Sequence, residues 1–201
     1  MGIRDRRDIE KVEMKKKIKG AAIGLIEQEG YENLSIRKIA SKIEYSPTTI
    51  YLYYKDKAAI ITDISDDLYH KVESMAAAII NSKTAHSIDQ RMSNLLNSFI
   101  MCLCGEPEMA KAIMYSGTNV IFSGNTGDAP HNSGIGLLDH LIEDGIAKKE
   151  LKPNITHTSW MIISALLGFV MGSIENQLYK RNDFGKLAED FVEILMGGIR
   201  Q

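Results

Sequence analysis

The segment from Ser35 to Lys57 constrains the fold more than any other part of the chain. Ser35 can cap a helix, and the residues that follow place apolar side chains at helical spacing, namely Ile36, Ile39, Ala40 and Ile43. Leu34 precedes this cap and can pack against Ile39 as a hydrophobic staple. The pattern predicts a short helix that begins just after Ser35.

A second capping pattern follows after a turn of a few residues. Ser46 can cap the next helix, and Pro47 suits its first position because no backbone N–H is needed there. Tyr45 can pack on Ile50 as a second staple, and Asp56 can cap a third helix. Two short helices joined by a tight turn are typical of a helix-turn-helix, whose second helix reads DNA.

Apolar residues recur at helical spacing along the rest of the chain as well. They predict helices over 9–29, where Gly30 is the stop, and over 57–82, 88–105, 107 onward, 133–146, 156–180 and 183–199. Residues 116–133 contain three glycines and one proline, which predicts a loop that is either a cover over a pocket or a surface connection. No segment predicts a strand. We therefore expect an all-α fold of about nine helices, with a three-helix head at residues 1–56 and a body at residues 57–201.

The distribution of charge supports a nucleic-acid partner for the head. The whole chain has a formal charge of only −2. However, residues 1–60 hold 13 Lys/Arg against 9 Asp/Glu, a net charge of +4, and the remainder holds 11 against 17, a net charge of −6. The basic part is the part that contains the motif. By themselves, lysines such as Lys15, Lys16, Lys17 and Lys19 would indicate only a solvated helix face.

Other classes of protein find little support in the sequence. No signal segment opens the chain, and the apolar run from Trp160 to Ile174 falls short of the roughly 20 residues that span a bilayer. Cys102 and Cys104 suggest reduced thiols in a cytoplasm, and the five histidines show no close ligand pair. We find no sequence motif of a serine hydrolase, P-loop or zinc protease. We expect a cytoplasmic protein that is not an enzyme and has no metal, cofactor or membrane partner.

Specific residues resemble the TetR family of transcriptional regulators. In the head they are Ala22, Gly30-Tyr31, L-S-I-R-K-I-A at 34–40 and S-P-T-T-I-Y-L-Y-Y-K-D-K at 46–57. In the body, I-E-D-G-I-A-K-K-E-L-K-P-N-I-T at 142–156 is similar to the turn before the family's dimer-forming helices. The resemblance spans the chain and is stronger in the head. Glu44 departs from it, because the family usually has glycine there; a left-handed backbone at Glu44 would cost roughly 1 kcal/mol.

The resemblance implies a DNA interface at the helix-turn-helix. Thr49, Tyr51 and Lys57 would hold backbone phosphates, next to the cap Ser46. The residues that would face the major groove are Arg37, Pro47, Thr48, Leu52 and Tyr53. Arg37 is the best candidate for a specific pair because its fork matches guanine O6 and N7. Ile39, Ile50 and Tyr54 are expected in the core, and Lys38, Lys42 and Lys55 are expected only to raise general affinity for DNA.

The resemblance also implies a homodimer that binds a two-fold symmetric operator and responds to a small molecule. The expected dimer interface consists of Ser164, Gly168 and Gly172, a ridge of small residues, with Phe191 and Leu195 on the last helix; the alternative is that the ridge packs within one subunit. The expected effector pocket is mostly apolar and is lined by Phe99, Met114, Phe122, His140, Trp160 and Met171, although any single methionine is more commonly core.

The function predicted from the sequence is a DNA-binding transcriptional regulator, a repressor released from its operator by a small, largely apolar effector. Two alternatives stay open at this point. The first is a helical adaptor or activator that acts through a protein partner. The second is an enzyme whose scattered residues assemble a site that no motif reveals.

Overall fold

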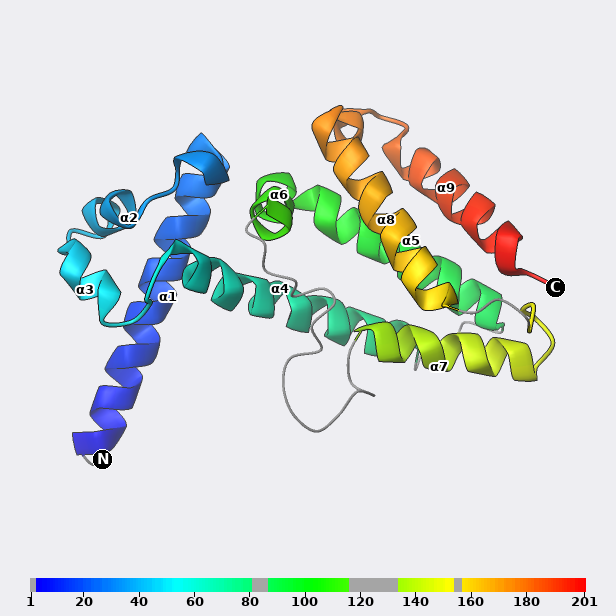
Figure 1. Ribbon diagram of the computed structural model, residues 1–201, viewed down its shortest axis with the longest axis horizontal. Coiled ribbons are helices and arrows are strands. Elements are labelled where there is room, and N and C mark those ends of the chain that lie inside the picture. Colours follow the sequence, from blue (N-terminus) through cyan, green and yellow to red (C-terminus); the bar gives the residue numbers. More distant parts are fainter. Residues whose placement is uncertain (1–2, 81–86, 116–133, 154–156) are drawn as a thin grey trace. The chain divides into compact units, whose positions relative to one another are not determined.

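The computed structural model describes residues 3–80, 87–115, 134–153 and 157–201 (Figure 1). These residues form nine α-helices and two short 3-10 helices, and within the described ranges there is no strand. The only regular pairing outside the helices in these ranges is an isolated bridge between Leu151 and Arg200. The predicted all-α fold of about nine helices is confirmed.

The chain divides into two compact units. The N-terminal unit contains Met1–Leu68 and Glu108–Thr118, and the C-terminal unit contains Tyr69–Pro107 and Asn119–Gln201. The units meet within one continuous helix, whereas the sequence suggested a boundary at residue 56, before that helix begins. The segment from Glu108 also belongs to the N-terminal unit, although it lies far along the chain from the head.

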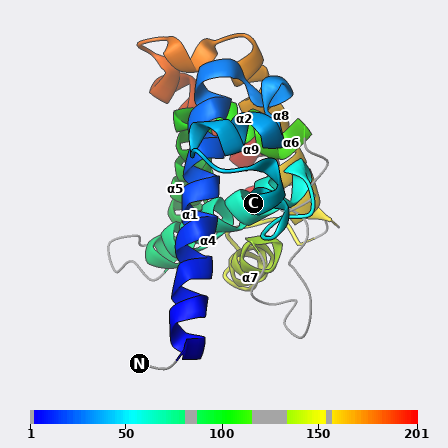
Figure 2. The same cartoon turned by 90° about the vertical axis from the view of Figure 1, so that its left-hand side faces the viewer.

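The N-terminal unit packs long and short helices around one apolar core. Its elements are α1 (Ile3–Glu29), the 3-10 helix η1 (Tyr31–Asn33), α2 (Ile36–Lys42), α3 (Pro47–Tyr51), the first part of α4 (Lys57–Ile80) and most of α6 (Pro107–Tyr115). The most deeply buried core side chains are Ile18, Ala22, Ile26, Ile39, Ala40, Ile50, Ile60, Ile61 and Ala112. α1 begins at Ile3, six residues before the predicted start, and both views show its first turns extending past α2 and α3 (Figures 1 and 2).

The predicted caps define the helix-turn-helix. The Ser35 hydroxyl accepts from the backbone N–H of Lys38, and the Ser46 hydroxyl accepts from that of Thr49. The Asp56 carboxylate accepts from the backbone N–H of Ala59 and so caps α4. Side-chain caps satisfy N–H groups that a helix start leaves without partners. Three of the local structures predicted from the sequence are therefore confirmed.

Two residues of the N-terminal unit have a left-handed backbone. Gly30 ends α1 with φ 79°, which suits glycine. Glu44, in the turn between α2 and α3, has φ 61°. The turn is held by the Glu44 N–H, which donates to Ser41 O at 3.2 Å, and by the Tyr45 N–H, which donates to Ala40 O at 2.9 Å. The conformation predicted for Glu44 is confirmed, and these backbone bonds offset its cost.

Besides the last part of α4, the C-terminal unit contains four α-helices and one 3-10 helix. They are α5 (Ile88–Gly105), α7 (Gly134–Ala147), α8 (Thr158–Glu175), the 3-10 helix η3 (Leu178–Lys180) and α9 (Phe184–Ile199). Figure 1 shows α5 beside α8 and α9, and α5 also contacts α7. The rings of Phe169 on α8 and Phe191 on α9 stack at 4.2 Å between centroids.

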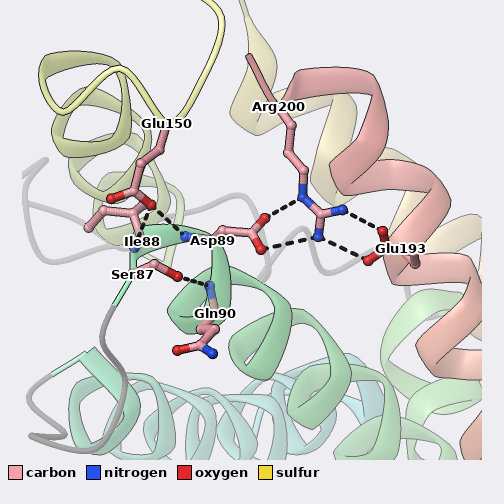
Figure 3. Close-up of polar contacts among 7 residues, drawn as sticks. All are labelled: Ser87, Ile88, Asp89, Gln90, Glu150, Glu193 and Arg200. Atoms are coloured by element: carbon pink, nitrogen blue, oxygen red, sulfur yellow. Dashed lines mark hydrogen bonds and ion pairs between the residues drawn. The ribbon is translucent and has the colours of Figure 1, made fainter.

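A polar cluster ties the end of α9 to the start of α5 (Figure 3). The Arg200 guanidinium donates to both carboxylate oxygens of Asp89, at 2.6 and 3.1 Å, and it also pairs with Glu193. The Glu150 carboxylate accepts from the backbone N–H groups of Ile88 and Asp89, at 2.9 and 3.3 Å. These contacts, which we name the Arg200 cluster, fix three segments that lie far apart in the sequence.

The helix α8 has the length and apolar composition of a membrane-spanning helix, and it is the one helix with this property in the part of the chain that the structure describes. Half of its residues are buried inside the structure, and it contacts α5 and α7. Such a helix in the core of a folded unit passes the same test of length and composition. The packing is that of the buried core helix predicted from the sequence.

Three details of the C-terminal unit differ from prediction. α8 ends at Glu175 because Gln177 takes a left-handed backbone with φ 56°, and η3 follows instead of further α-helix. Asp183 stands at the cap position of α9, but its carboxylate accepts from Arg181 at 2.7 and 2.8 Å and does not cap the helix. Trp160 lies 49% exposed on α8, away from the buried side on which the helical spacing placed it.

Replacing Glu44 with glycine should stabilise the N-terminal unit. Glycine adopts φ near +60° without the steric cost that an L side chain has there, and this gain is partly offset by the larger entropy of glycine in the unfolded chain. We expect Glu44→Gly to raise the free energy of unfolding by about 1 kcal/mol in urea denaturation. Glu44→Ala is the control, since it removes the carboxylate and keeps the strained Cβ. Equal effects of the two substitutions would argue against backbone strain.

Candidate nucleic-acid interface

The helix α3 has one buried side and one exposed side, as the helix that enters the groove must have. Ile50 is fully buried and anchors α3 in the core. Tyr51 is 56% exposed and Leu52 is 76% exposed, and Pro47 and Thr48 at the start of α3 are also exposed. An exposed leucine of this extent beside hydroxyl groups can contact thymine methyls and base edges.

Thr49 and Tyr53 are half-buried, so they flank the exposed side of α3. The hydroxyls of Ser46 and Thr49 lie 3.0 Å apart and hydrogen-bond each other, in addition to the capping bond. The Ser46 hydroxyl is therefore engaged in capping α3. The Thr49 hydroxyl keeps lone pairs that can accept further hydrogen bonds, and its side chain is half-buried. This geometry fits a phosphate contact through Thr49 more closely than through Ser46.

Arg37 is exposed on α2, whereas its neighbour Lys38 is engaged in an ion pair. Lys38 Nζ lies 2.5 Å from Glu29 Oε2, and both side chains are largely exposed. Lys42 donates to Gln28 Oε1 at 3.4 Å. A lysine beside a carboxylate adds little to the attraction of phosphate at a distance. Of the cations on α2, Arg37 has the geometry best suited to reading a base.

Lys57, at the first position of α4, is held by Tyr31. Its Nζ lies 4.1 Å from the centroid of the Tyr31 ring and donates to the Tyr31 carbonyl at 3.4 Å. A cation over an aromatic face keeps its charge. Lys57 is thus half-buried and oriented, and a phosphate would have to approach it from its remaining exposed side.

A polar cluster joins α1 and α4 to the segment that follows α3. The Asp63 carboxylate on α4 accepts from Tyr54 Oη at 2.7 Å, from Lys15 Nζ at 2.9 Å and from Lys19 Nζ at 3.1 Å. Lys19 also pairs with Asp67 at 2.5 Å. We name these five residues the Asp63 cluster. It connects the end of the helix-turn-helix to both α1 and α4.

The environment of the Asp63 cluster shifts the pKa values of its members. Burial alone would raise the pKa of Asp63, but hydrogen bonds from three neighbouring side chains outweigh it and lower the pKa from 3.8 to about 2. Burial, together with the hydrogen bond to Asp63, raises the pKa of Tyr54. Burial would lower the pKa of Lys19, but its two carboxylate partners raise it. Asp63 and Lys19 therefore stay charged near neutral pH, and the Tyr54 hydroxyl stays protonated and neutral.

The sequence analysis missed the Asp63 cluster, although a signal for it exists. Lys15 and Lys19 lie four residues apart on α1, and Asp63 and Asp67 lie four residues apart on α4. Residues at this spacing share one face of a helix. Two such pairs of opposite charge on two helices of one unit indicate a contact between those faces. The spacing alone does not reveal that Tyr54 joins them.

The residues predicted to line an effector pocket occupy different parts of the chain. Phe99 and Met171 are half-buried in the C-terminal unit, and Met114 is half-buried in the N-terminal unit. His140 and Trp160 are exposed on α7 and α8, and Phe122 lies outside the described residues. The pocket stays a prediction.

The residues predicted for a dimer interface lie on α8 and α9. Ser164 and Gly168 are exposed, while Gly172, Phe191 and Leu195 are half-buried. A Cβ added at Gly168 or Gly172 would meet no other atom within 4 Å. Trp160, Met161 and Ile194 are further large apolar residues exposed on these two helices. The ridge is therefore not closely packed within this subunit, and the interface stays a prediction.

The described residues contain no group of three His, Cys, Asp or Glu side chains that could hold a metal ion. Burial raises the pKa of both cysteine thiols, for Cys104 to about 11. Thiolate chemistry is thus not favoured at these two positions.

Comparison with known proteins matches residues 18–64 to the family described as "Bacterial regulatory proteins, tetR family". The matched segment contains the whole helix-turn-helix and the Asp63 carboxylate. None of the curated protein sequences matches the chain.

Several solved structures share the fold over nearly the whole chain. The fatty acid degradation regulator FadR from Bacillus halodurans is 19% identical with a TM-score of 0.71, covering 92% of this chain and 95% of that one. The transcriptional regulator FadR from Bacillus subtilis, in complex with stearoyl-CoA, is 22% identical with a TM-score of 0.67, covering 92% and 98%. A putative fatty acid metabolism regulator from Clostridium perfringens is 17% identical with a TM-score of 0.63, covering 91% and 98%. At these identities the likeness concerns the fold.

The low pKa of Asp63 makes part of the stability dependent on acid pH. Because the folded-state pKa lies below the unfolded value, the stabilisation is present above about pH 4 and is lost as the pH falls towards about 2. We expect thermal unfolding of the wild type and of Asp63→Asn to differ most above pH 4 and to converge towards pH 2. A difference that stays constant over this range would contradict the assignment.

Proposed function

We propose that this chain, which belongs to the TetR family of bacterial regulatory proteins, is a repressor released from its operator by a small, largely apolar effector. The observation that carries the DNA-binding part is α3, a capped helix with Ile50 buried and Tyr51 and Leu52 exposed, within a segment that matches the family. Its neighbours in structure are transcription regulators, which supports a regulator over an enzyme.

The proposed DNA interface divides into base-reading and phosphate-binding residues. Arg37, Pro47, Thr48, Leu52 and Tyr53 would face the major groove, and Thr49, Tyr51 and Lys57 would hold phosphates. Base contacts set the sequence that is recognised, and phosphate contacts set position and salt dependence. A bacterial operator lies in the cytoplasm, so we expect the protein there.

We propose that two copies bind one operator. One helix-turn-helix contacts too few base pairs for useful specificity, and a two-fold symmetric dimer doubles the site. The exposed small residues Ser164 and Gly168 and the exposed apolar residues Trp160, Met161 and Ile194 support α8 and α9 as the dimer surface. A ridge of small residues allows a partner helix to approach closely.

We propose that the effector is a long apolar molecule with a polar end, bound in the C-terminal unit. The structural neighbour from Bacillus subtilis was solved with stearoyl-CoA, which makes long-chain acyl thioesters the first compounds to test. Buried polar atoms support a polar end, because Arg91 Nε, Asn97 Oδ1 and Ser173 Oγ have no hydrogen-bond partner among the described residues. Such atoms are uncommon in folded proteins and gain most from a ligand that satisfies them.

The mechanism would be a shift between two populations of the dimer. A ligand that prefers the form unable to bind the operator weakens DNA binding by its difference in affinity for the two forms. α4 begins in the N-terminal unit and continues into the C-terminal unit, so it is the covalent route by which a change in one unit could reach the other.

Arg37→Ala should weaken binding to the DNA upstream of the protein's own gene by about 1–3 kcal/mol, because a bidentate contact to guanine is lost. The matched control is Lys38→Ala, which removes an adjacent lysine that is already paired with Glu29. Gel-shift titrations on this DNA and on a scrambled duplex provide the measurement. The loss for Arg37→Ala should appear mainly on the upstream DNA. No wild-type shift at low salt would overturn the proposed function.

Stearoyl-CoA should release the complex with the upstream DNA and raise the thermal stability of the free protein. Saturation at about 100 times the dissociation constant stabilises a protein by about 2.7 kcal/mol. Coenzyme A without the acyl chain is the control and should do neither. If stearoyl-CoA and other long-chain amphiphiles leave both measurements unchanged while the wild type binds DNA, the effector proposal is wrong and the DNA-binding proposal stands.

A further inference from the structure

Three lysines in the middle of α1, namely Lys15, Lys17 and Lys19, have different partners. Lys15 and Lys19 donate to the Asp63 carboxylate on α4. Lys17 lies between them in the sequence and points to another side of the helix, because successive helical residues are about 100° apart. It is exposed, and it forms no ion pair with any residue in the described part of the chain. Its charge is therefore free to act on a partner molecule.

An aromatic ring fixes the position of this charge. Lys17 Nζ lies 4.8 Å from the centroid of the Tyr45 ring. Tyr45 directly precedes Ser46, the cap of α3, and its backbone N–H donates to Ala40 O at 2.9 Å. The ring is 41% exposed rather than packed in the core, so it supports the ammonium at the surface. A ring holds a cation without cancelling its charge.

This contact places the Tyr45 ring against a lysine of α1. The ring carries a cation there, next to the residues proposed to touch DNA. A restrained ammonium loses less side-chain freedom on binding a phosphate than an unrestrained one does. Because α1 runs past α2 and α3 in both views, a residue on α1 can contribute to the same surface as α3 (Figures 1 and 2).

We propose that Lys17 is a phosphate-binding residue of the DNA interface and that Tyr45 is the positioning residue that holds it beside α3. The proposal rests on the proposed DNA-binding function and extends the interface to α1, one residue before the segment that matches the family. Lys17 would contact the DNA backbone and not a base, so it would contribute to affinity for any sequence.

The test measures binding to the upstream DNA and to a scrambled duplex over a range of salt concentrations. Lys17→Gln should weaken both complexes by a similar factor and make the slope of log K against log salt shallower by about 0.9 for each head bound. Lys17→Arg keeps the charge and the ring contact and should bind like the wild type. Lys16→Gln is the matched control, since Lys16 is also exposed on α1, and it should have a smaller effect.

Variants of Tyr45 test whether the position of the Lys17 ammonium matters for DNA binding in addition to its charge. Tyr45→Leu removes the ring and should weaken both complexes with the charge of Lys17 intact, whereas Tyr45→Phe keeps the ring and should bind like the wild type. In the Lys17→Gln background, Tyr45→Leu should add no further loss. Circular dichroism checks that each variant is folded.

The outcomes distinguish this proposal from the one on which it rests. If the wild type binds neither DNA, the proposed function fails. If the wild type binds but Lys17→Gln behaves like Lys16→Gln, or lowers affinity without changing the salt slope, the role of Lys17 is wrong and DNA binding through α3 stands. If Lys17→Gln weakens binding as expected but Tyr45→Leu does not, the positioning role of Tyr45 is overturned.

Discussion

The carboxylate of Asp63 is the interaction on which the geometry of the N-terminal unit depends. It receives hydrogen bonds from Lys15 and Lys19 on α1 and from Tyr54, which follows α3. A half-buried carboxylate must keep its partners because an unpaired charge there is costly. Apolar packing around Ile50 holds α3 in the core but has no directional preference of its own. The Asp63 cluster adds directional contacts that fix Tyr54, and with it the end of the helix-turn-helix, against α1 and α4.

The cations of the N-terminal unit do not act as one uniform basic surface. Lys15, Lys19 and Lys38 form ion pairs with carboxylates. Lys17 and Lys57 instead lie over aromatic rings, which do not cancel their charge. A net charge counted from the sequence treats all of these side chains as equal. The structure separates charges that maintain the fold from charges that remain available to a polyanion. The surface around α3 therefore combines a few placed cations with hydroxyl and apolar groups, which suits recognition of a particular site.

Features that depend on a few neighbouring residues could be predicted from the sequence. The caps at Ser35, Ser46 and Asp56 and the strained turn at Glu44 are of this kind, because each is set within four residues of the chain. The caps indicated a helix-turn-helix, and the resemblance to the TetR family implied which residues of α3 form the candidate interface. The Asp63 cluster could not be placed in the same way, since its contacts between lysine and aspartate join residues 44 to 48 positions apart. The side of α8 that faces outward was also misjudged at Trp160, because a helix that is apolar nearly all round has no polar face to orient it.

The Arg200 cluster has a consequence for the order in which the chain folds. Arg200 and Asp89 are 111 residues apart, yet their contact fixes the start of α5, and the neighbouring Gln201 N–H donates to Glu150 O at 3.1 Å. Contacts across such a separation form late, because closing the long intervening loop costs entropy before the two residues can meet. During synthesis, α1, α2 and α3 can already meet while α5 still lacks the residues that anchor it. The C-terminal unit is therefore completed only after residue 200 has left the ribosome.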